Sequence, residues 1–234
     1  NFDGKELLGL SHKELRPFRK RAQIIFQDPF GSLDPRMTVG RIIAEPMIIH
    51  GEVKKDELRE RVLNLLERVE LGSEHMSRYP HAFSGGQRQR ICIARVLGLN
   101  PSLIIADESV AALDVTIQAQ VINLLMDLQA EQKISFLFIS HDMAVVERIA
   151  HRVAVMYAGE IVEIGGRRDV FNNPQHSYTK KLLGSVPVAD PRQRRTSRRI
   201  NIDEIPSVIH PVEYEPVHLP FRHIKGNHYV REEQ

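Results

Sequence analysis

Two short apolar runs are separated by a segment whose apolar residues recur at helical spacing. Leu103–Ala106 is fully apolar, and Ile134–Ile139 is apolar apart from Ser135; both runs predict buried strands of a parallel sheet. Between them, Val115–Leu128 repeats apolar residues at the helical period, and Met143–Ala150 predicts another helix. Strands that alternate with helices in this order predict a parallel sheet with helices packed on it.

The residues before these runs are predicted to be mostly helical. Ser11 and Glu14 form a capping box, which predicts the start of a short helix. Ala22–Phe26 is a brief apolar run that predicts a strand leading into a loop. Three further helices are expected, over residues 38–49, 54–69 and 86–97. Because this helical stretch interrupts the alternation of strands and helices, residues 37–98 are expected to form a helical subdomain.

The region after Ala150 predicts a hairpin and then loses its periodicity. Arg152–Tyr157 and Glu160–Ile164 flank an Ala-Gly pair, which is typical of a tight hairpin turn. A short helix is expected at Lys180–Leu183, and from Pro187 onward repeated prolines replace the regular pattern. We therefore predict a domain over residues 1–185 and a C-terminal extension over residues 186–234.

The composition is ordinary for a soluble globular protein, with 234 residues, 42% of them hydrophobic and 26% charged. A formal net charge of +2 gives no global electrostatic case for binding nucleic acid. No apolar run approaches the length needed to cross a bilayer. The single cysteine, Cys92, excludes an intrachain disulfide and a cysteine-cluster metal site, and it fits a reducing cytosol best.

Asp107 and Glu108 directly follow the first of the two apolar runs. A carboxylate at the end of a buried strand can hold Mg²⁺, usually through water, while its neighbour orients an attacking water molecule. The alternative is a solvated pair of acids after a strand. The residues around the pair favour the first interpretation, because Ser109–Asp114 follows directly and a glycine-led helix precedes it.

That helix begins at Ser84-Gly85-Gly86-Gln87, which places two glycines at its tip. Glycines let the backbone approach an oxyanion, and the N-terminus of a helix carries partial positive charge. A plain glycine turn capped by Ser84 is the alternative. The acidic strand end about twenty residues later, in the order typical of nucleotide-binding proteins, favours the phosphate-binding interpretation.

Two further polar residues follow predicted strands. His141 comes after Ile134–Ile139, where a histidine can donate a hydrogen bond to a terminal phosphate oxygen. Gln27 ends the earlier strand, and its amide can reach Mg²⁺ or a water molecule. Taken singly, such a histidine is more often a structural hydrogen-bonding residue, and such a glutamine is usually exposed.

Taken in order, these residues resemble the ATP-binding cassette ATPases, the motor subunits of ABC transporters, over about residues 1–185. The matches are the Q-loop at Gln27, the signature at Phe83–Gln87, the Walker B strand at Leu103–Asp107, the catalytic glutamate at Glu108, the D-loop at Ala111–Asp114 and the switch histidine at His141. The resemblance implies the α/β fold of P-loop NTPases: a parallel sheet with an inserted helical subdomain.

The resemblance also implies the ligands and the roles of these residues. ATP and Mg²⁺ are expected as ligands. Gln27 and Asp107 are expected to coordinate the metal. Glu108 is expected to activate water, and His141 to stabilise the transition state. In the family, two cassettes stack head to tail. Ser84, Gly85, Gly86 and Gln87 are therefore expected to clamp the γ-phosphate held by the partner cassette, and Asp114 is also expected in the nucleotide site.

Two segments narrow the resemblance. Phe26–Pro35 and Asn173–Thr179 look like the corresponding segments of the peptide and nickel importer group. The tail Val188–Gln234 looks most like the glutathione importer ATP-binding proteins. The arginines between Arg192 and Arg199 are expected to form a solvated linker, with acidic lipid or nucleic acid as the alternative ligand.

The sequence departs from the family pattern in two places. Ala111 stands where the D-loop usually begins with serine, which removes a hydroxyl that can help to link the two nucleotide sites. The sequence of 234 residues contains no G-x-x-x-x-G-K-[ST] phosphate-binding loop. Because the chain begins at Asn1 in mid-pattern, we expect an N-terminal truncation that removes the first strands and this loop. The polypeptide by itself is expected to hydrolyse almost no ATP.

We expect the chain to act as the energy-coupling subunit of an importer of small peptides or glutathione-like solutes. Its expected partners are a second cassette, membrane permease subunits and, indirectly, a periplasmic solute-binding protein, with no nucleic acid. The expected location is the cytoplasmic face of the inner membrane, as a peripheral protein. Two alternatives remain: a soluble cassette ATPase acting on nucleic acid or ribosomes, and a non-catalytic cassette.

Overall fold

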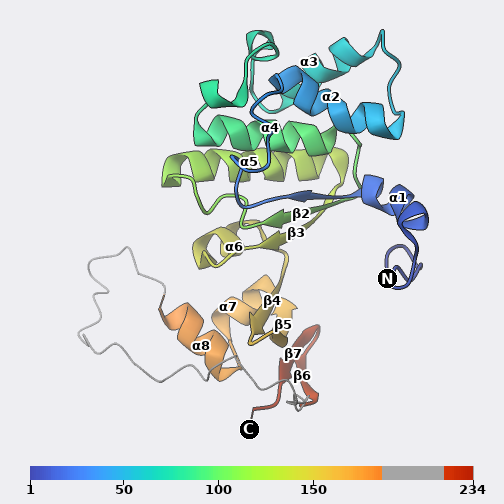
Figure 1. Ribbon diagram of the computed structural model, residues 1–234. Coiled ribbons are helices and arrows are strands. Elements are labelled where there is room, and N and C mark those ends of the chain that lie inside the picture. The colour runs from blue at the N-terminus through green and yellow to red at the C-terminus, as the bar shows by residue number, and fades with distance from the viewer. Residues whose placement is uncertain (186–218, 234) are drawn as a thin grey trace, which may run out of the picture. The chain divides into compact units, whose positions relative to one another are not determined.

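The computed structural model describes residues 1–185 and 219–233, and Figure 1 shows it as a ribbon. The chain divides into two compact units, Asn1–Val145 and Val146–Gln234, and each is described by itself. The predicted division into residues 1–185 and 186–234 stays a prediction. The arginines between Arg192 and Arg199 lie outside the described residues.

A three-stranded parallel sheet forms the base of the first unit. Its strands are β1 (Ala22–Ile25), β2 (Leu103–Asp107) and β3 (Ser135–Ile139), in the order β1-β2-β3. Ile25 lies opposite Ala106, and Asp107 lies opposite Ile139, so the three strands end close together. The predicted parallel sheet is confirmed.

The prediction that β3 is a buried strand is wrong. Leu137 is 53% exposed and Ile139 is 45% exposed, although Ile134, just before the strand, is buried. β3 is the last strand in the sheet order, so within the described residues no strand pairs with its outer edge. Val115 is likewise exposed rather than packed, because it is the first residue of its helix.

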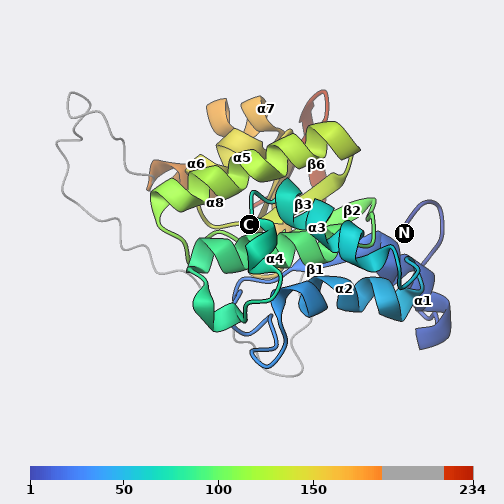
Figure 2. The same cartoon turned by 90° about the horizontal axis from the view of Figure 1, so that it is seen from above.

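Helices cover this sheet in layers (Figures 1 and 2). α4 (Gly85–Leu97) and α5 (Val115–Gln132) contact each other, and α4 also contacts β1. α2 (Val39–His50) and α3 (Leu58–Arg68) both contact α4, which is why α4 is buried along most of its length. The shared core is apolar and includes Ile25, Ile43, Met47, Leu65, Leu66, Ile91, Ile93, Leu97, Ile104 and Leu125.

Local sequence signals explain where several of these helices begin. α1 (His12–Arg21) has the predicted capping box, in which Ser11 and Glu14 exchange hydrogen bonds. α3 begins at Leu58, later than the predicted Lys54, because a turn precedes it. Short 3₁₀ turns at Ser73–His75 and Pro80–Ala82 connect α3 to α4. Cys92 lies inside α4, and burial raises the pKa of its thiol to about 11, so it behaves as a small apolar side chain.

The second unit is built on an antiparallel sheet with the order β4-β5-β7-β6. β4 (Arg152–Tyr157) and β5 (Glu160–Gly166) form the predicted hairpin. Its turn residues, Ala158 and Gly159, both have positive φ, as a type I′ two-residue hairpin turn requires. α6 (Met143–Ile149) runs into this unit, and α7 (Arg167–Asn172) and α8 (Ser177–Gly184) follow β5.

The hairpin of β6 (Phe221–Lys225) and β7 (His228–Arg231) was not predicted. Lys225 pairs with His228, so only Gly226 and Asn227 form the loop. Gly226 has a φ of 57°, which glycine adopts without strain. A Gly-Asn pair between two β-rich stretches is a hairpin signal, and it was hidden by the prolines that precede it.

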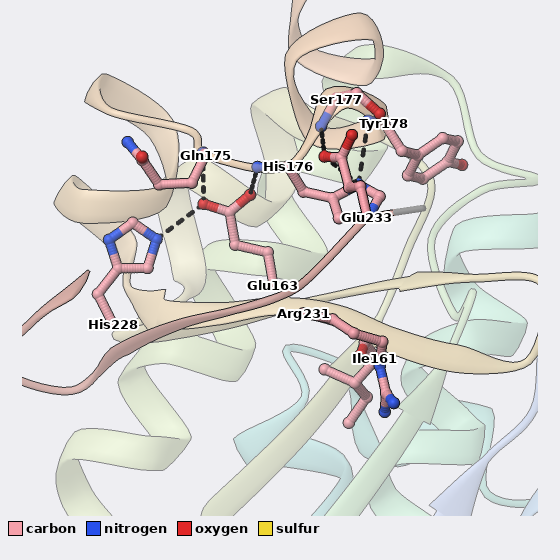
Figure 3. A network of polar contacts seen from close by, with 9 residues as sticks. All are labelled: Ile161, Glu163, Gln175, His176, Ser177, Tyr178, His228, Arg231 and Glu233. Carbon is pink, nitrogen blue, oxygen red and sulfur yellow. Dashed lines mark hydrogen bonds and ion pairs between the residues drawn. The ribbon is translucent and has the colours of Figure 1, made fainter. Parts of the chain in front are cut away.

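A buried carboxylate joins three segments of the second unit (Figure 3). Glu163 on β5 is fully buried, and its carboxylate accepts hydrogen bonds from the backbone N–H groups of Gln175 (2.9 Å) and His176 (3.0 Å). It also lies 2.7 Å from Nε2 of His228 on β7. Glu233 in turn accepts a hydrogen bond from the backbone of Ser177, at the start of α8. These contacts attach the C-terminal hairpin and the start of α8 to β5.

We predict that Glu163→Gln lowers the free energy of unfolding of the second unit by about 3 kcal/mol at neutral pH, because it breaks a buried charged network. Burial raises the pKa of the Glu163 carboxyl, but the hydrogen bonds outweigh burial and hold the pKa below its ordinary value. The ionised carboxylate therefore stabilises the fold above about pH 4.3, and this contribution is lost as the pH falls through the lowered pKa.

Hydrogen–deuterium exchange of β7 and α8 in the full chain measures this effect. Exchange in the Glu163→Gln variant should be faster at pH 7, and the difference from wild type should shrink in acid. Glu147→Gln is the matched control, because Glu147 is exposed on α6. Equal protection of β7 in wild type and in Glu163→Gln at pH 7 would contradict the prediction.

Candidate functional site

The predicted polar residues gather where the three parallel strands end. Gln27 lies two residues after β1, Glu108 directly follows β2, and His141 lies two residues after β3. Because the strands are parallel neighbours in register, their carboxyl ends share one edge of the sheet. This edge is where open α/β sheets bind their ligands.

Glu108 lies at the centre of this group. Nε2 of Gln27 donates a 2.6 Å hydrogen bond to Oε2 of Glu108, across 81 residues of sequence. Nδ1 of His141 lies 3.2 Å from Oε1 of the same carboxylate. Since a carboxylate only accepts hydrogen bonds, this contact places a proton on Nδ1 of His141. The structure thus brings three predicted residues together.

The backbone at Glu108 is also unusual. Its φ is 42°, in the left-handed region that residues other than glycine seldom adopt. Its N–H donates a 3.0 Å hydrogen bond to the carbonyl of Ile139, which holds the strand end in place. The side chain is 30% exposed, and that of His141 is 71% exposed, so the carboxylate remains open to solvent on one side. Strained backbone of this kind is concentrated at functional sites.

The residues at this edge fit a magnesium ion. Asp107 is half-buried at the end of β2 and offers a carboxylate. Gln27 uses its Nε2 to hold Glu108, so its amide oxygen is available as a ligand. Within the described residues, no group of three or more His, Cys, Asp and Glu side chains could enclose a metal ion. Mg²⁺ needs no such cage, because it is usually bound by one or two protein oxygens, water and substrate phosphates.

The predicted phosphate-binding tip lies at the start of α4. Ser84 is the N-cap, and a capping box joins it to Gln87: the Ser84 N–H donates to Oε1 of Gln87 (3.0 Å), and the Gln87 N–H donates to Oγ of Ser84 (3.4 Å). The Ser84 hydroxyl proton is therefore free to point toward a ligand. The roles of these residues in nucleotide binding stay predictions.

The two glycines at this tip are there for different reasons. A Cβ atom on Gly85 would make an ordinary contact at 3.6 Å with Leu113. A Cβ atom on Gly86 would lie 2.3 Å from Cγ2 of Ile117 on α5, which is far inside van der Waals contact. Gly86 is buried and lets α4 approach α5, whereas Gly85 is partly exposed. The structure thus gives Gly86 a packing role that sequence reasoning missed.

Asp114 has a structural role as well. Its Oδ1 accepts a 3.1 Å hydrogen bond from the N–H of Ile117, so it caps α5. Its predicted contact with nucleotide stays a prediction. Ala111 is exposed between β2 and α5, and its N–H donates to the carbonyl of Glu108 at 3.0 Å.

An apolar groove lies on the helices above the sheet. It encloses about 810 Å³ and is lined by residues of α2 and α3, including Ala44, Ile48, Ile49, Leu58 and Val62. Ile48 is 60% exposed and Ile49 is 58% exposed, so two large apolar side chains face solvent beside each other. Arg41, Lys55 and Arg59 also line the groove together with one acid, Glu45, so its charged lining is positive on balance.

Comparison with known proteins identifies the fold and the family. The sequence profile described as ABC transporter matches residues 1–111, and the profile described as oligopeptide/dipeptide transporter, C-terminal region, matches residues 162–209. A solved structure of the ATP-binding cassette MJ0796, a dimer in a post-hydrolysis state bound to ADP and Pi, is 30% identical with a TM-score of 0.63. That match covers 71% of this chain and 72% of that chain. The chain belongs to the ABC transporter family.

Other members of the ABC transporter family are also similar to it. The structure of cbiO1 from Clostridium perfringens, part of the ABC transporter complex cbiONQ, is 31% identical with a TM-score of 0.62, and covers 70% of this chain and 64% of that chain. The α/β cassette fold that the sequence predicted is confirmed.

Curated relatives are more similar in sequence. The glutathione import ATP-binding protein GsiA of Pectobacterium atrosepticum is 57% identical over 98% of this chain, and that of Escherichia coli is 56% identical over 100% of it. This ABC chain spans 37% of the length of each of these relatives. Among the helices of residues 1–185 and 219–233, none is both long and apolar enough to span a bilayer.

Proposed function

We propose that this chain belongs to the ATP-binding, energy-coupling subunit of an importer for small peptides or glutathione-like solutes. The observation that carries the proposal is the carboxylate of Glu108, held between Gln27 and His141 at the end of the parallel sheet. Curated relatives that are named glutathione import ATP-binding proteins support the choice of solute class. ATP is the proposed substrate.

In this proposal, Glu108 is the general base of ATP hydrolysis. Its carboxylate orients the attacking water and accepts its proton as the new bond to the γ-phosphorus forms and ADP leaves. The Gln27 amide fixes Oε2 of the carboxylate, which leaves Oε1, on the side of His141, for the water. Asp107 and Gln27 would hold Mg²⁺, which would supply positive charge to neutralise the phosphates. His141 is 71% exposed, so its ring can turn to donate a hydrogen bond to a phosphate oxygen.

The tip of α4 serves a second nucleotide, bound by a partner cassette. The free N–H groups of the first turn and the helix dipole favour a phosphate anion there. Gly85, which has no side chain in the way, lets the backbone approach that phosphate, and the Ser84 hydroxyl donates a further hydrogen bond. Two cassettes stacked head to tail would thus complete each other's sites.

The groove on α2 and α3 is the proposed contact with the membrane permeases. An amphipathic helix fits an apolar groove of this size, and the Arg41 and Arg59 side chains favour acidic residues on its flank. The subunit would be peripheral, on the cytoplasmic face of the inner membrane, and would meet a periplasmic solute-binding protein only through the permeases.

Reconstitution tests this proposal. The full-length protein, co-purified with two permeases in vesicles, is expected to hydrolyse ATP and to take up a labelled peptide. The polypeptide of 234 residues by itself is expected to show little turnover, because it contains no G-x-x-x-x-G-K-[ST] loop to neutralise phosphate charge.

The groove is tested in the same preparation. Ile48→Glu should reduce permease capture, since it places a charge on an apolar contact. Leu8→Glu is the matched control, because Leu8 is 87% exposed and lies outside the groove. Salt-sensitive binding of nucleic acid without permease capture would contradict the proposal and favour a soluble cassette.

A further inference from the structure

The loop between β1 and α2 is a stiff turn that begins at Gln27. Oδ1 of Asp28 accepts a 2.8 Å hydrogen bond from the N–H of Phe30. The hydroxyl of Ser32 donates a 2.6 Å hydrogen bond to the carbonyl of Asp28. Leu33, which follows, is buried with 2% exposure. Because these bonds close the turn on itself, the loop is expected to move as one piece with Gln27.

The same loop is attached to α4 at two points. The guanidinium of Arg88 lies 3.9 Å from the centre of the Phe30 ring, which is a close cation–π contact. The side chain of Arg95 donates a 2.6 Å hydrogen bond to the carbonyl of Ser32. Positions 88 and 95 are two helical turns apart, so both arginines reach the loop from one side of α4.

Arg88 lies one turn inside the tip of α4. Its backbone N–H donates a 2.9 Å hydrogen bond to the carbonyl of Ser84, the N-cap. Its guanidinium also donates to the carbonyl of His81 (3.5 Å), while its Nε atom is buried without a hydrogen-bond partner. Phe30 is 60% exposed, so the ring has little other packing to hold it. The contact thus links the loop to the phosphate-binding tip.

We propose that the Arg88–Phe30 contact couples the two halves of the ATPase machinery within one cassette, with Arg88 as a positioning residue. This inference rests on the proposed function. The path runs from Glu108 through Gln27 and the loop to Phe30, and from Arg88 to the tip at Ser84. A displacement of Gln27 when the nucleotide is bound or hydrolysed at Glu108 is thereby transmitted to the tip that serves the partner's nucleotide.

The test is the dependence of ATP turnover on ATP concentration, measured on the full-length protein assembled with its permeases. In a dimer of two coupled sites, the Hill coefficient approaches about 2. Arg88→Gln and Phe30→Leu should each lower it toward about 1, and the double variant should lower it no further. Arg88→Lys keeps the cation over the ring and should restore most of the cooperativity.

Phe18→Leu is the matched control. Phe18 carries a similar cation–π contact with Lys5, at 5.4 Å, which lies outside this path. The control should leave the Hill coefficient unchanged. Thermal unfolding of each variant separates loss of coupling from loss of fold, and Arg88→Lys serves as the folded comparison if Arg88→Gln is unstable.

The outcomes are separable. A wild-type assembly that hydrolyses no ATP would refute the proposed function. A wild-type assembly that hydrolyses ATP without cooperativity overturns the coupling inference and leaves the function intact. The inference is also overturned if Arg88→Gln and Phe30→Leu lower the maximal rate but keep the wild-type Hill coefficient, since Arg88 then acts only on the fold.

Discussion

Replacing Glu108 with glutamine in the full-length protein is expected to lower ATP turnover by about 10²–10⁴-fold, the usual contribution of a general base. The glutamine side chain has the same shape but takes up no proton from water. ATP binding should be nearly unchanged, because the residues proposed to hold the metal and the phosphates remain. Steady-state hydrolysis and equilibrium ATP binding, measured on one preparation, separate these two effects.

The local geometry explains why Glu108→Gln should not disturb the fold. The new amide oxygen can still accept the hydrogen bond from Nε2 of Gln27. The amide NH₂ group then faces His141, whose Nδ1 must become the acceptor, so the imidazole changes tautomer. This change should add to the loss of activity without a cost in packing, since both side chains are open to solvent.

Glu131→Gln is the matched control for this prediction, because Glu131 is an exposed carboxylate on α5. It should leave hydrolysis at the wild-type rate. If Glu108→Gln and Glu131→Gln both turn over ATP like wild type, Glu108 is not the base, and the proposed reaction at this edge of the sheet is wrong.

The second large effect is expected at Gly86. Gly86→Ala should lower the free energy of unfolding of the first unit by about 2 kcal/mol, as overpacking of a close helix contact does. The added Cβ meets Cγ2 of Ile117 at 2.3 Å, and a β-branched side chain in a helix has little freedom to rotate away. The gain of up to ~1 kcal/mol in helix propensity offsets only part of this clash.

Urea denaturation of the full chain measures the change. Gly85→Ala is the matched control, since its Cβ would lie 3.6 Å from the nearest atom outside its own helix backbone, and its stability should equal or exceed that of wild type. Ile117→Leu moves the branch away from Cβ and should recover most of the loss when combined with Gly86→Ala. Equal stability of the Gly85→Ala and Gly86→Ala variants would show that Gly86 is not a packing residue.

Local patterns in the sequence were enough to locate the main elements. The capping box at Ser11, the short apolar run Leu103–Ala106 and the Ala158-Gly159 turn each determine the local backbone within a few residues. These signals predict well because the hydrogen bonds and the periodicity that produce them are local. The order of Gln27, Glu108 and His141 at strand ends likewise predicted a shared site, since parallel neighbouring strands end together.

Other features of the cassette depend on contacts between distant residues. Burial of β3 could not be read from its apolar composition, because burial depends on which strands and helices cover it. The closeness of Gly86 to Ile117 depends on how two helices cross, and a glycine at a helix start has the same local pattern whether it faces a ligand or another helix. Arg88 and Phe30 each look like ordinary surface residues until the loop and α4 are placed side by side.

The sequence by itself therefore determined the cassette family, the parallel strands and the identity of the polar residues at their ends, because each depends on residues close together in the chain or on a fixed order of motifs. Only the tertiary structure decided which side chains meet. Glu163 finds its hydrogen-bond partners on the segment at Gln175 and His176 and on His228, 65 residues away, and no local periodicity records a contact of that kind.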